Sequence, residues 1–109
     1  MTIKPVIPRA RAALDVEAAI DFYLATDAEP PALGLIDALQ ATYRLIGMHP
    51  GVGSPRFGHE LDIPGLRSRA LARFPYTVFY LEREDHVDVW RVLHQSRDIP
   101  ELMRGLDKE

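Results

Sequence analysis

The chain has 109 residues, the usual size of one domain, so we expect a single domain over 1–109. Hydrophobic residues make up 47% of the chain and charged residues 27%, which is the balance of an ordinary globular protein. The 16 acidic side chains outnumber the 13 Lys and Arg side chains, and the net charge of −3 disfavours nucleic-acid binding driven by charge. Cysteine is absent, which excludes disulfides, thiolate catalysis and zinc sites built from cysteine.

The sequence carries no pattern typical of secretion, membranes or metal sites. No apolar run approaches the roughly 20 residues that cross a bilayer, and segment 1–8 lacks the long apolar stretch of a signal peptide. His49, His59 and His86 lack the spacing of metal ligands. We therefore expect a cytoplasmic protein with no metal, no other cofactor and no membrane partner.

The N-terminal half predicts a short strand followed by two helices. β-branched residues over 2–7 favour a strand, and its proline suits a sheet edge. Apolar residues at spacings of three and four predict helices over 8–26 and 31–48, and the prolines between them favour an antiparallel helical hairpin. On the first helix we expect the acidic residues to face water, namely Asp15, Glu17 and Asp21.

The C-terminal half predicts strands. Residues 49–65 hold three Pro and four Gly and are interpreted as one long ordered loop. We expect strands over 66–72, 76–81 and 87–94, and a polar turn joins the last two into a β-hairpin. Apolar residues on both faces of the last strand predict a central strand that is covered on both sides.

Asp98 and Glu101 have the spacing of a capping box and predict a short C-terminal helix. The predicted order is β-α-α-β-β-β followed by this helix. It describes an α+β domain in which a helical hairpin packs on a small antiparallel sheet.

Several local strings resemble the ParE branch of the RelE/ParE superfamily, the toxins of type II toxin–antitoxin modules. The strings keep the family's order, and the resemblance covers nearly the whole chain. They are Pro8-Arg-Ala-Arg-Ala-Ala-Leu, His49-Pro-Gly-Val-Gly-Ser-Pro-Arg56, Pro64-Gly-Leu-Arg-Ser68, Phe74-Pro-Tyr-Thr-Val-Phe-Tyr80 and Arg91-Val-Leu-His-Gln-Ser-Arg-Asp98.

This resemblance implies a toxin of the kind linked to plasmid stabilisation, which arrests growth when free. It also implies a cognate ParD-like antitoxin, encoded beside the toxin, that neutralises it. Members closest to ParE poison DNA gyrase, whereas the RelE branch cleaves mRNA on the ribosome.

The residues favour the gyrase branch. RNA cleavage requires basic side chains that converge on one sheet face around the scissile phosphate. The positions that resemble the basic ones of the ribonucleases fall on Thr77 and near Ser68 and Ala70, while alternation places Arg67 and Arg69 on the opposite face. We therefore expect a protein-binding toxin with no active site of its own.

Two other readings stay open. One is a RelE-like ribosome-dependent endoribonuclease that uses Arg91, His94 and Arg97 with Arg69 or Arg73. The other is a degenerate toxin that retains only antitoxin binding.

Arg91, His94 and Arg97 are the candidates for target binding, because a strand end beside a loop can present such side chains to a partner. The structural alternative is that Arg91 pairs with an acid on a neighbouring strand, His94 bonds a backbone carbonyl and Arg97 neutralises the C-terminal turn. We expect Trp90 in the core. The candidates for binding an acidic antitoxin tail are Arg9, Arg11, Arg67, Arg69 and Arg73.

Overall fold

The computed structural model describes residues 3–25, 29–97 and 99–103. Asp98, the predicted cap of the last helix, lies outside them. None of the described helices is both long enough and apolar enough to cross a membrane. The elements, in chain order, are β1 (Val6–Pro8), α1 (Ala10–Ala25), α2 (Glu29–Met48), η1 (Pro50–Val52), α3 (Arg56–Glu60), β2 (Leu66–Ala70), β3 (Tyr76–Glu82), β4 (Val87–His94) and α4 (Ile99–Met103).

The predicted β-α-α-β-β-β order is confirmed. The four strands form one sheet in the order β1-β4-β3-β2, in which β3 is antiparallel to both of its neighbours. The sheet is mixed and not purely antiparallel, because β1 pairs with β4 in the parallel sense, with Val6 opposite Val87. A strand that is linked to its neighbour through helices, and not through a tight turn, is free to pair in this way.

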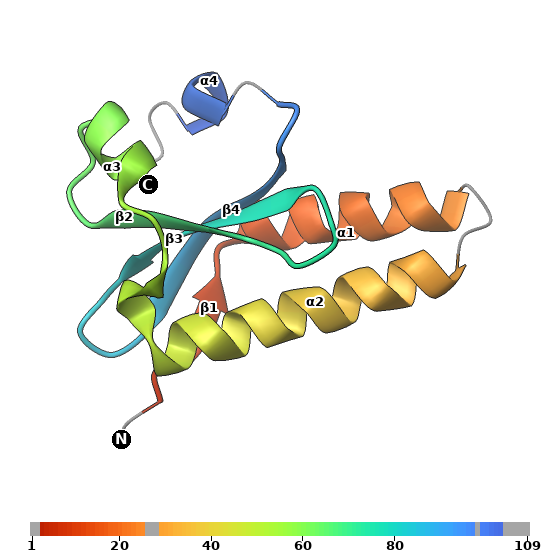
Figure 1. Ribbon diagram of the computed structural model, residues 1–109, viewed down its shortest axis with the longest axis horizontal. Helices are drawn as coiled ribbons and strands as arrows, with labels where there is room; N and C mark the ends of the chain where they lie inside the picture. The colour runs from red at the N-terminus through yellow and green to blue at the C-terminus, as the bar shows by residue number, and fades with distance from the viewer. Residues whose placement is uncertain (1–2, 26–28, 98, 104–109) are drawn as a thin grey trace.

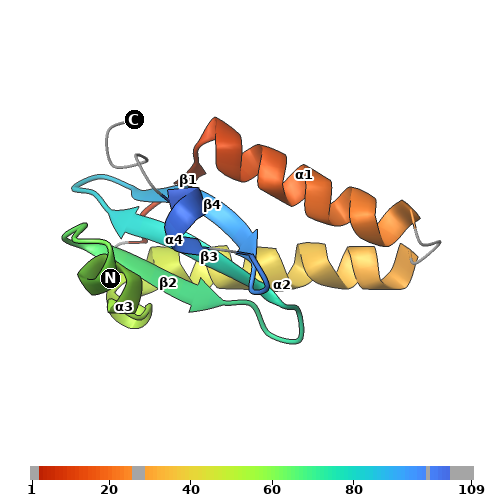
Figure 2. The same cartoon turned by 90° about the horizontal axis from the view of Figure 1, so that it is seen from above.

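The sheet is covered on both faces. The long α1–α2 hairpin packs on one face, and the short helices α3 and α4 lie over the other (Figures 1 and 2). Two apolar cores result: Val78 and Val92 belong to the hairpin side, whereas Phe79 and Trp90 belong to the α3–α4 side. The prediction of a central last strand covered on both sides is confirmed.

The helix boundaries differ from the predicted ones for local reasons. Helix α1 begins at Ala10 and not at residue 8, because Pro8 closes β1 and the Arg9 amide donates to Val89 O at 2.9 Å. Helix α2 begins at Glu29, and its first turn holds Pro30 and Pro31. A first turn has no intrahelical acceptor for its amide groups, so prolines are tolerated there.

The prediction of one long loop over 49–65 is wrong, because this segment contains η1 and α3. Helix η1 begins at Pro50, and Pro55 directly precedes the first residue of α3. Helix α3 approaches β2 so closely that a Cβ on Gly58 would lie 2.6 Å from Leu66 O. Glycine therefore allows α3 to lie against the edge strand.

Candidate functional site

Arg91 is held inside the fold by Asp15 of α1. Arg91 Nε lies 2.7 Å from Asp15 Oδ2, and Arg91 Nη2 lies 2.8 Å from Oδ1. The amide of Val92 donates a third hydrogen bond to Oδ2 at 3.0 Å. Arg91 is only 7% exposed, so its guanidinium is occupied within the molecule. The prediction that Asp15 faces water is wrong, because its carboxylate is bonded to Arg91 and Val92 of β4, the strand against which α1 packs.

Arg9 is likewise engaged, in a cluster around Asp88. Its Nε and Nη2 each lie 3.1 Å from the carboxylate of Asp88, and its guanidinium stacks 4.4 Å above the ring of Trp90. Trp90 Nε1 donates to the same carboxylate at 3.0 Å, and so does Arg83 Nη2 at 3.0 Å. Trp90 is 2% exposed, which confirms that it belongs to the core.

The environment of Asp88 favours its charged form. Burial by itself would raise the pKa of this carboxyl, but hydrogen bonds from Arg9, Arg83 and Trp90 outweigh burial and hold the pKa below its usual value. The cluster therefore fixes β1 and the start of α1 against β4.

His94 and Arg97 lie at the opposite end of β4, on a hydrogen-bonded turn. The Ser96 amide donates to His94 Nδ1 at 3.0 Å, and the Arg97 amide donates to His94 O at 3.0 Å. The amide donor makes Nδ1 the acceptor nitrogen of the ring. His94 thus caps the turn that follows it, and its ring meets Tyr76 edge-on at 5.1 Å between centroids.

A groove of about 330 Å³ runs between α1 and the end of β4 and is here called the α1–β4 groove. Ala18 and Phe22 of α1 form part of its apolar lining, and Leu14 lies four residues before Ala18 on the same helix face. Leu14 is 62% exposed and Phe22 is 60% exposed. Ala18, Phe22, Tyr76, Leu93, His94 and Arg97 are among the residues that line the groove.

A second groove, of about 490 Å³, lies on the other face of the sheet between α3 and the start of α4, and is here called the α3–α4 groove. Phe57, Thr77 and Gln95 contribute to its lining. Arg56 and Arg97 are the only cationic residues among the described ones that line it, and Arg56 is paired with Glu60 at 3.2 Å. Arg97 borders both grooves.

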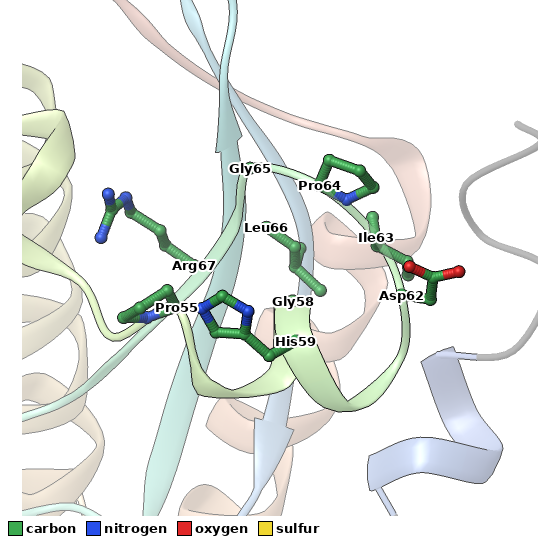
Figure 3. A pocket seen from close by; sticks show the side chains of 9 residues that line it. All are labelled: Pro55, Gly58, His59, Asp62, Ile63, Pro64, Gly65, Leu66 and Arg67. Carbon is green, nitrogen blue, oxygen red and sulfur yellow. The ribbon is translucent and has the colours of Figure 1, made fainter.

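A third pocket, of about 560 Å³, lies between α3 and the start of β2 (Figure 3). Much of its wall is apolar, and His59 and Arg67 are its basic residues. Arg67 Nη1 donates to Gly53 O at 2.8 Å. No group of three or more potential metal ligands occurs in the part of the chain that the structure describes.

The family model for the ParE toxin of the type II toxin–antitoxin system parDE matches residues 6–99. The chain belongs to the ParE toxin family. A solved structure, "Chromosomal ParDE TA system from P. aeruginosa", shares the ParE fold with a TM-score of 0.69 at 19% sequence identity. The match covers 84% of this chain and 96% of that one. No curated protein matches the chain.

On this ParE fold, the strand positions considered for a nuclease carry no base. Register places Ser68 opposite Phe79 and Ala70 opposite Thr77, on the face that α3 and α4 cover. Arg67 and Arg69 pair with Tyr80 and Val78 and so lie on the hairpin face. The predicted separation of these arginines from their small neighbours is confirmed.

The five arginines expected to bind an antitoxin tail belong to separate parts of the ParE fold. Arg9 is in the Asp88 cluster, and Arg11 is exposed on α1. Arg67 and Arg69 lie on β2, at the sheet edge opposite β1, and Arg73 lies in the following turn with a positive φ of 69°. The exposed apolar face of α1 was missed from the sequence, although the four-residue spacing of Leu14, Ala18 and Phe22 signals it.

Proposed function

We propose that this ParE-family chain is a type II toxin that a ParD-type antitoxin neutralises and that acts by binding DNA gyrase. The observation that carries the proposal is the exposed apolar face of α1, which continues into a groove ending at His94 and Arg97. Leu14 and Phe22 are exposed to 62% and 60% and share a helix face, and neighbouring exposed apolar side chains support a protein-binding surface.

The antitoxin contact follows from the shape and chemistry of this face. A toxin that must be kept inactive needs an interface of about 1,200 Å² or more. An amphipathic segment that folds on binding can cover the α1 face and enter the α1–β4 groove with its apolar side. Leu14 and Phe22 are suitable anchors for it, in addition to the arginines Arg11, Arg69 and Arg73, which are exposed.

For the target contact we propose the end of β4. Arg97 is exposed there on a turn whose backbone is fixed by hydrogen bonds, so it is presented in a defined place. We do not propose Arg91 as a target contact, because its guanidinium is bonded to Asp15. Arginine is enriched among the residues that dominate protein–protein binding energy.

Binding is favoured over RNA cleavage by the uncharged residues on the α3–α4 face. A nuclease stabilises the charge at the phosphate with several converging bases. Here Ser68, Ala70 and Thr77 lie on that face, and one of the two arginines of its groove is paired with an acid. The RelE-like ribonuclease is therefore the less supported reading.

The test is inducible expression in a bacterium, with a DNA-damage reporter and mRNA integrity measured in the same culture. We expect growth arrest and DNA damage with intact mRNA, and relief of both when the adjacent antitoxin gene is co-expressed. Cleaved mRNA without DNA damage selects the ribonuclease. Unimpaired growth selects a degenerate toxin that keeps only antitoxin binding.

A further inference from the structure

Two largely buried hydroxyl groups on the α3–α4 face of the sheet have no partner among the described residues. Ser68 of β2 and Thr77 of β3 are each 8% exposed, and neither hydroxyl forms a hydrogen bond within the described part of the chain. In that part, Tyr43 Oη is the only buried side-chain polar atom that is both sealed from solvent and unpaired. The hydroxyls of Ser68 and Thr77 are therefore open to the surface, where a ligand can satisfy them.

Both hydroxyls line a pocket of about 380 Å³ beside the edge strand β2, here called the β2-edge pocket. Val52 and Phe57 supply apolar lining, and Arg56 and Arg69 are the only charged residues among the described ones that line it. Arg56 is paired with Glu60, but the two side chains are 68% and 48% exposed, and an exposed pair of this kind is exchanged at little cost. Hydroxyl donors beside arginine suit a carboxylate.

The edge of β2 beside this pocket has unpaired backbone groups at Ala70. The amide and carbonyl of Ser68 point away from β3 and exchange hydrogen bonds with Ser54 at 3.0 and 2.8 Å. Backbone direction alternates along a strand, so the amide and carbonyl of Ala70 point the same way. The segment before Ser54 turns into η1, and no described residue pairs with Ala70 at this edge. An extended peptide can therefore continue the edge where Ser54 leaves it.

We infer that the β2-edge pocket receives an extended acidic segment of the toxin's cellular target, whose backbone pairs with Ala70 and whose carboxylate accepts from the hydroxyls of Ser68 and Thr77. The existence of such a target rests on the proposed function. The pocket adjoins the α3–α4 groove, since Thr77 lines both, and Arg97 of the proposed target contact borders that groove. Free strand-edge groups match a peptide backbone, and the net charge of −3 disfavours RNA as the occupant.

The first test measures the toxin level that arrests growth and the affinity for the adjacently encoded antitoxin. Ser68→Ala and Thr77→Val each remove one hydroxyl and should raise the arresting level about tenfold, because a hydrogen bond to a carboxylate is lost. Ala70→Pro removes the outward amide without breaking the β2–β3 ladder and should act in the same direction. Antitoxin affinity should stay unchanged. The matched control is Thr42→Val, which removes a buried hydroxyl of α2 and should change neither quantity.

The second test titrates the purified chain with three probes and follows its backbone amides by NMR. The probes are an end-blocked hexapeptide of alternating Asp and Val, the same peptide with Lys in place of Asp, and a single-stranded RNA hexamer. We expect the Asp peptide alone to shift the amides of residues 66–70 and 77, and Thr77→Val to weaken that binding about tenfold. Absence of these shifts overturns the inference, and so does binding of the RNA hexamer in place of the Asp peptide.

These outcomes differ from a failure of the proposed function. If the wild-type chain does not arrest growth, the proposed function is wrong, and the assignment of the pocket to a target is wrong with it. If the wild type arrests growth while the three pocket variants match Thr42→Val, only the pocket inference is wrong. Variants that lose antitoxin affinity as strongly as arrest also overturn it, because the occupant is then the antitoxin.

Discussion

Asp15 and Arg91 form a bidentate ion pair that joins the first helix to the central strand across 76 positions of sequence. The carboxylate also accepts the Val92 amide, a group that a neighbouring strand would otherwise pair with. Strand β1 pairs with β4 only over Val87 to Val89. Beyond that point, the Asp15 carboxylate provides the acceptor for the exposed edge of β4. One side chain thus satisfies both a buried cation and an open strand edge.

We expect Asp15→Ala to destabilise the fold by about 3–5 kcal/mol, because it leaves the Arg91 guanidinium buried without its partner. Urea unfolding of the purified protein measures this free energy. The double variant Asp15→Ala, Arg91→Ala should be less destabilised than the sum of the two single variants, since the two residues interact directly. Additive losses would show that the ion pair is not the source of the effect.

The Asp88 cluster predicts a specific loss of stability in acid. Because the folded protein holds the pKa of Asp88 below its usual value, the carboxylate contributes stability above the unfolded pKa of about 3.9. This contribution disappears as the pH falls through the folded pKa. Asp88→Asn should therefore lower the unfolding free energy at pH 7, and its curve should converge with that of the wild type in acid. Asp37→Asn, at an exposed position of α2, is the control.

Tyr80 and Tyr43 should respond differently to loss of the hydroxyl. Tyr80 Oη donates to Pro50 O at 2.6 Å and accepts from the Gly53 amide at 2.9 Å, so it fastens η1 to the sheet. Tyr43 Oη is buried and has no hydrogen-bond partner within the described residues. Burial, and then the charge of Asp15, raise the pKa of Tyr43 to about 12.

We expect Tyr80→Phe to cost about 1–3 kcal/mol, because the Gly53 amide and the Pro50 carbonyl lose a buried partner. Tyr43→Phe should leave stability unchanged or raise it. Thermal or urea unfolding of the two variants, measured side by side, checks both expectations. An equal loss in the two variants would mean that shape and not hydrogen bonding sets their contribution.

The apolar face of α1 predicts poor solution behaviour of the free toxin. Leu14→Glu and Phe22→Glu should reduce self-association, because both side chains are more than half exposed and form part of an apolar surface. Their free energy of unfolding should change by less than about 0.5 kcal/mol, as is usual for exposed positions. Light scattering and urea unfolding measure the two effects. Leu39→Glu, a buried position of α2, serves as the contrast and should destabilise the fold.

The elements of the fold that depend on local pattern could be predicted from the sequence. The hairpin of α1 and α2 follows from two apolar stripes with prolines between them, and the β3–β4 hairpin follows from two β-rich runs around a charged turn. The parallel pairing of β1 could not be predicted, because no turn links β1 to β4. Helix α3 was missed because its five residues are too few for a periodic pattern.

The candidate site was predicted less well, because exposure and pairing depend on distant parts of the chain. Arg91 and Asp15 each have the appearance of a surface charge until the fold brings them together. The reverse holds for Phe22, which has the residue type of a core position but remains 60% exposed. Arg97 could be selected from its place after the last strand, but its position between two grooves needs the three-dimensional arrangement.

The central strand of the sheet is also the last of the four to leave the ribosome. Strand β1 is synthesised first, but it pairs with β4. The partner of the Asp15 carboxylate, Arg91 of β4, is synthesised 76 residues after Asp15. The α1–α2 hairpin has no complete sheet to pack on until β4 emerges, and closing contacts of this length is slow. A partly made chain therefore has neither groove, and both surfaces form only after β4 has been synthesised and has folded.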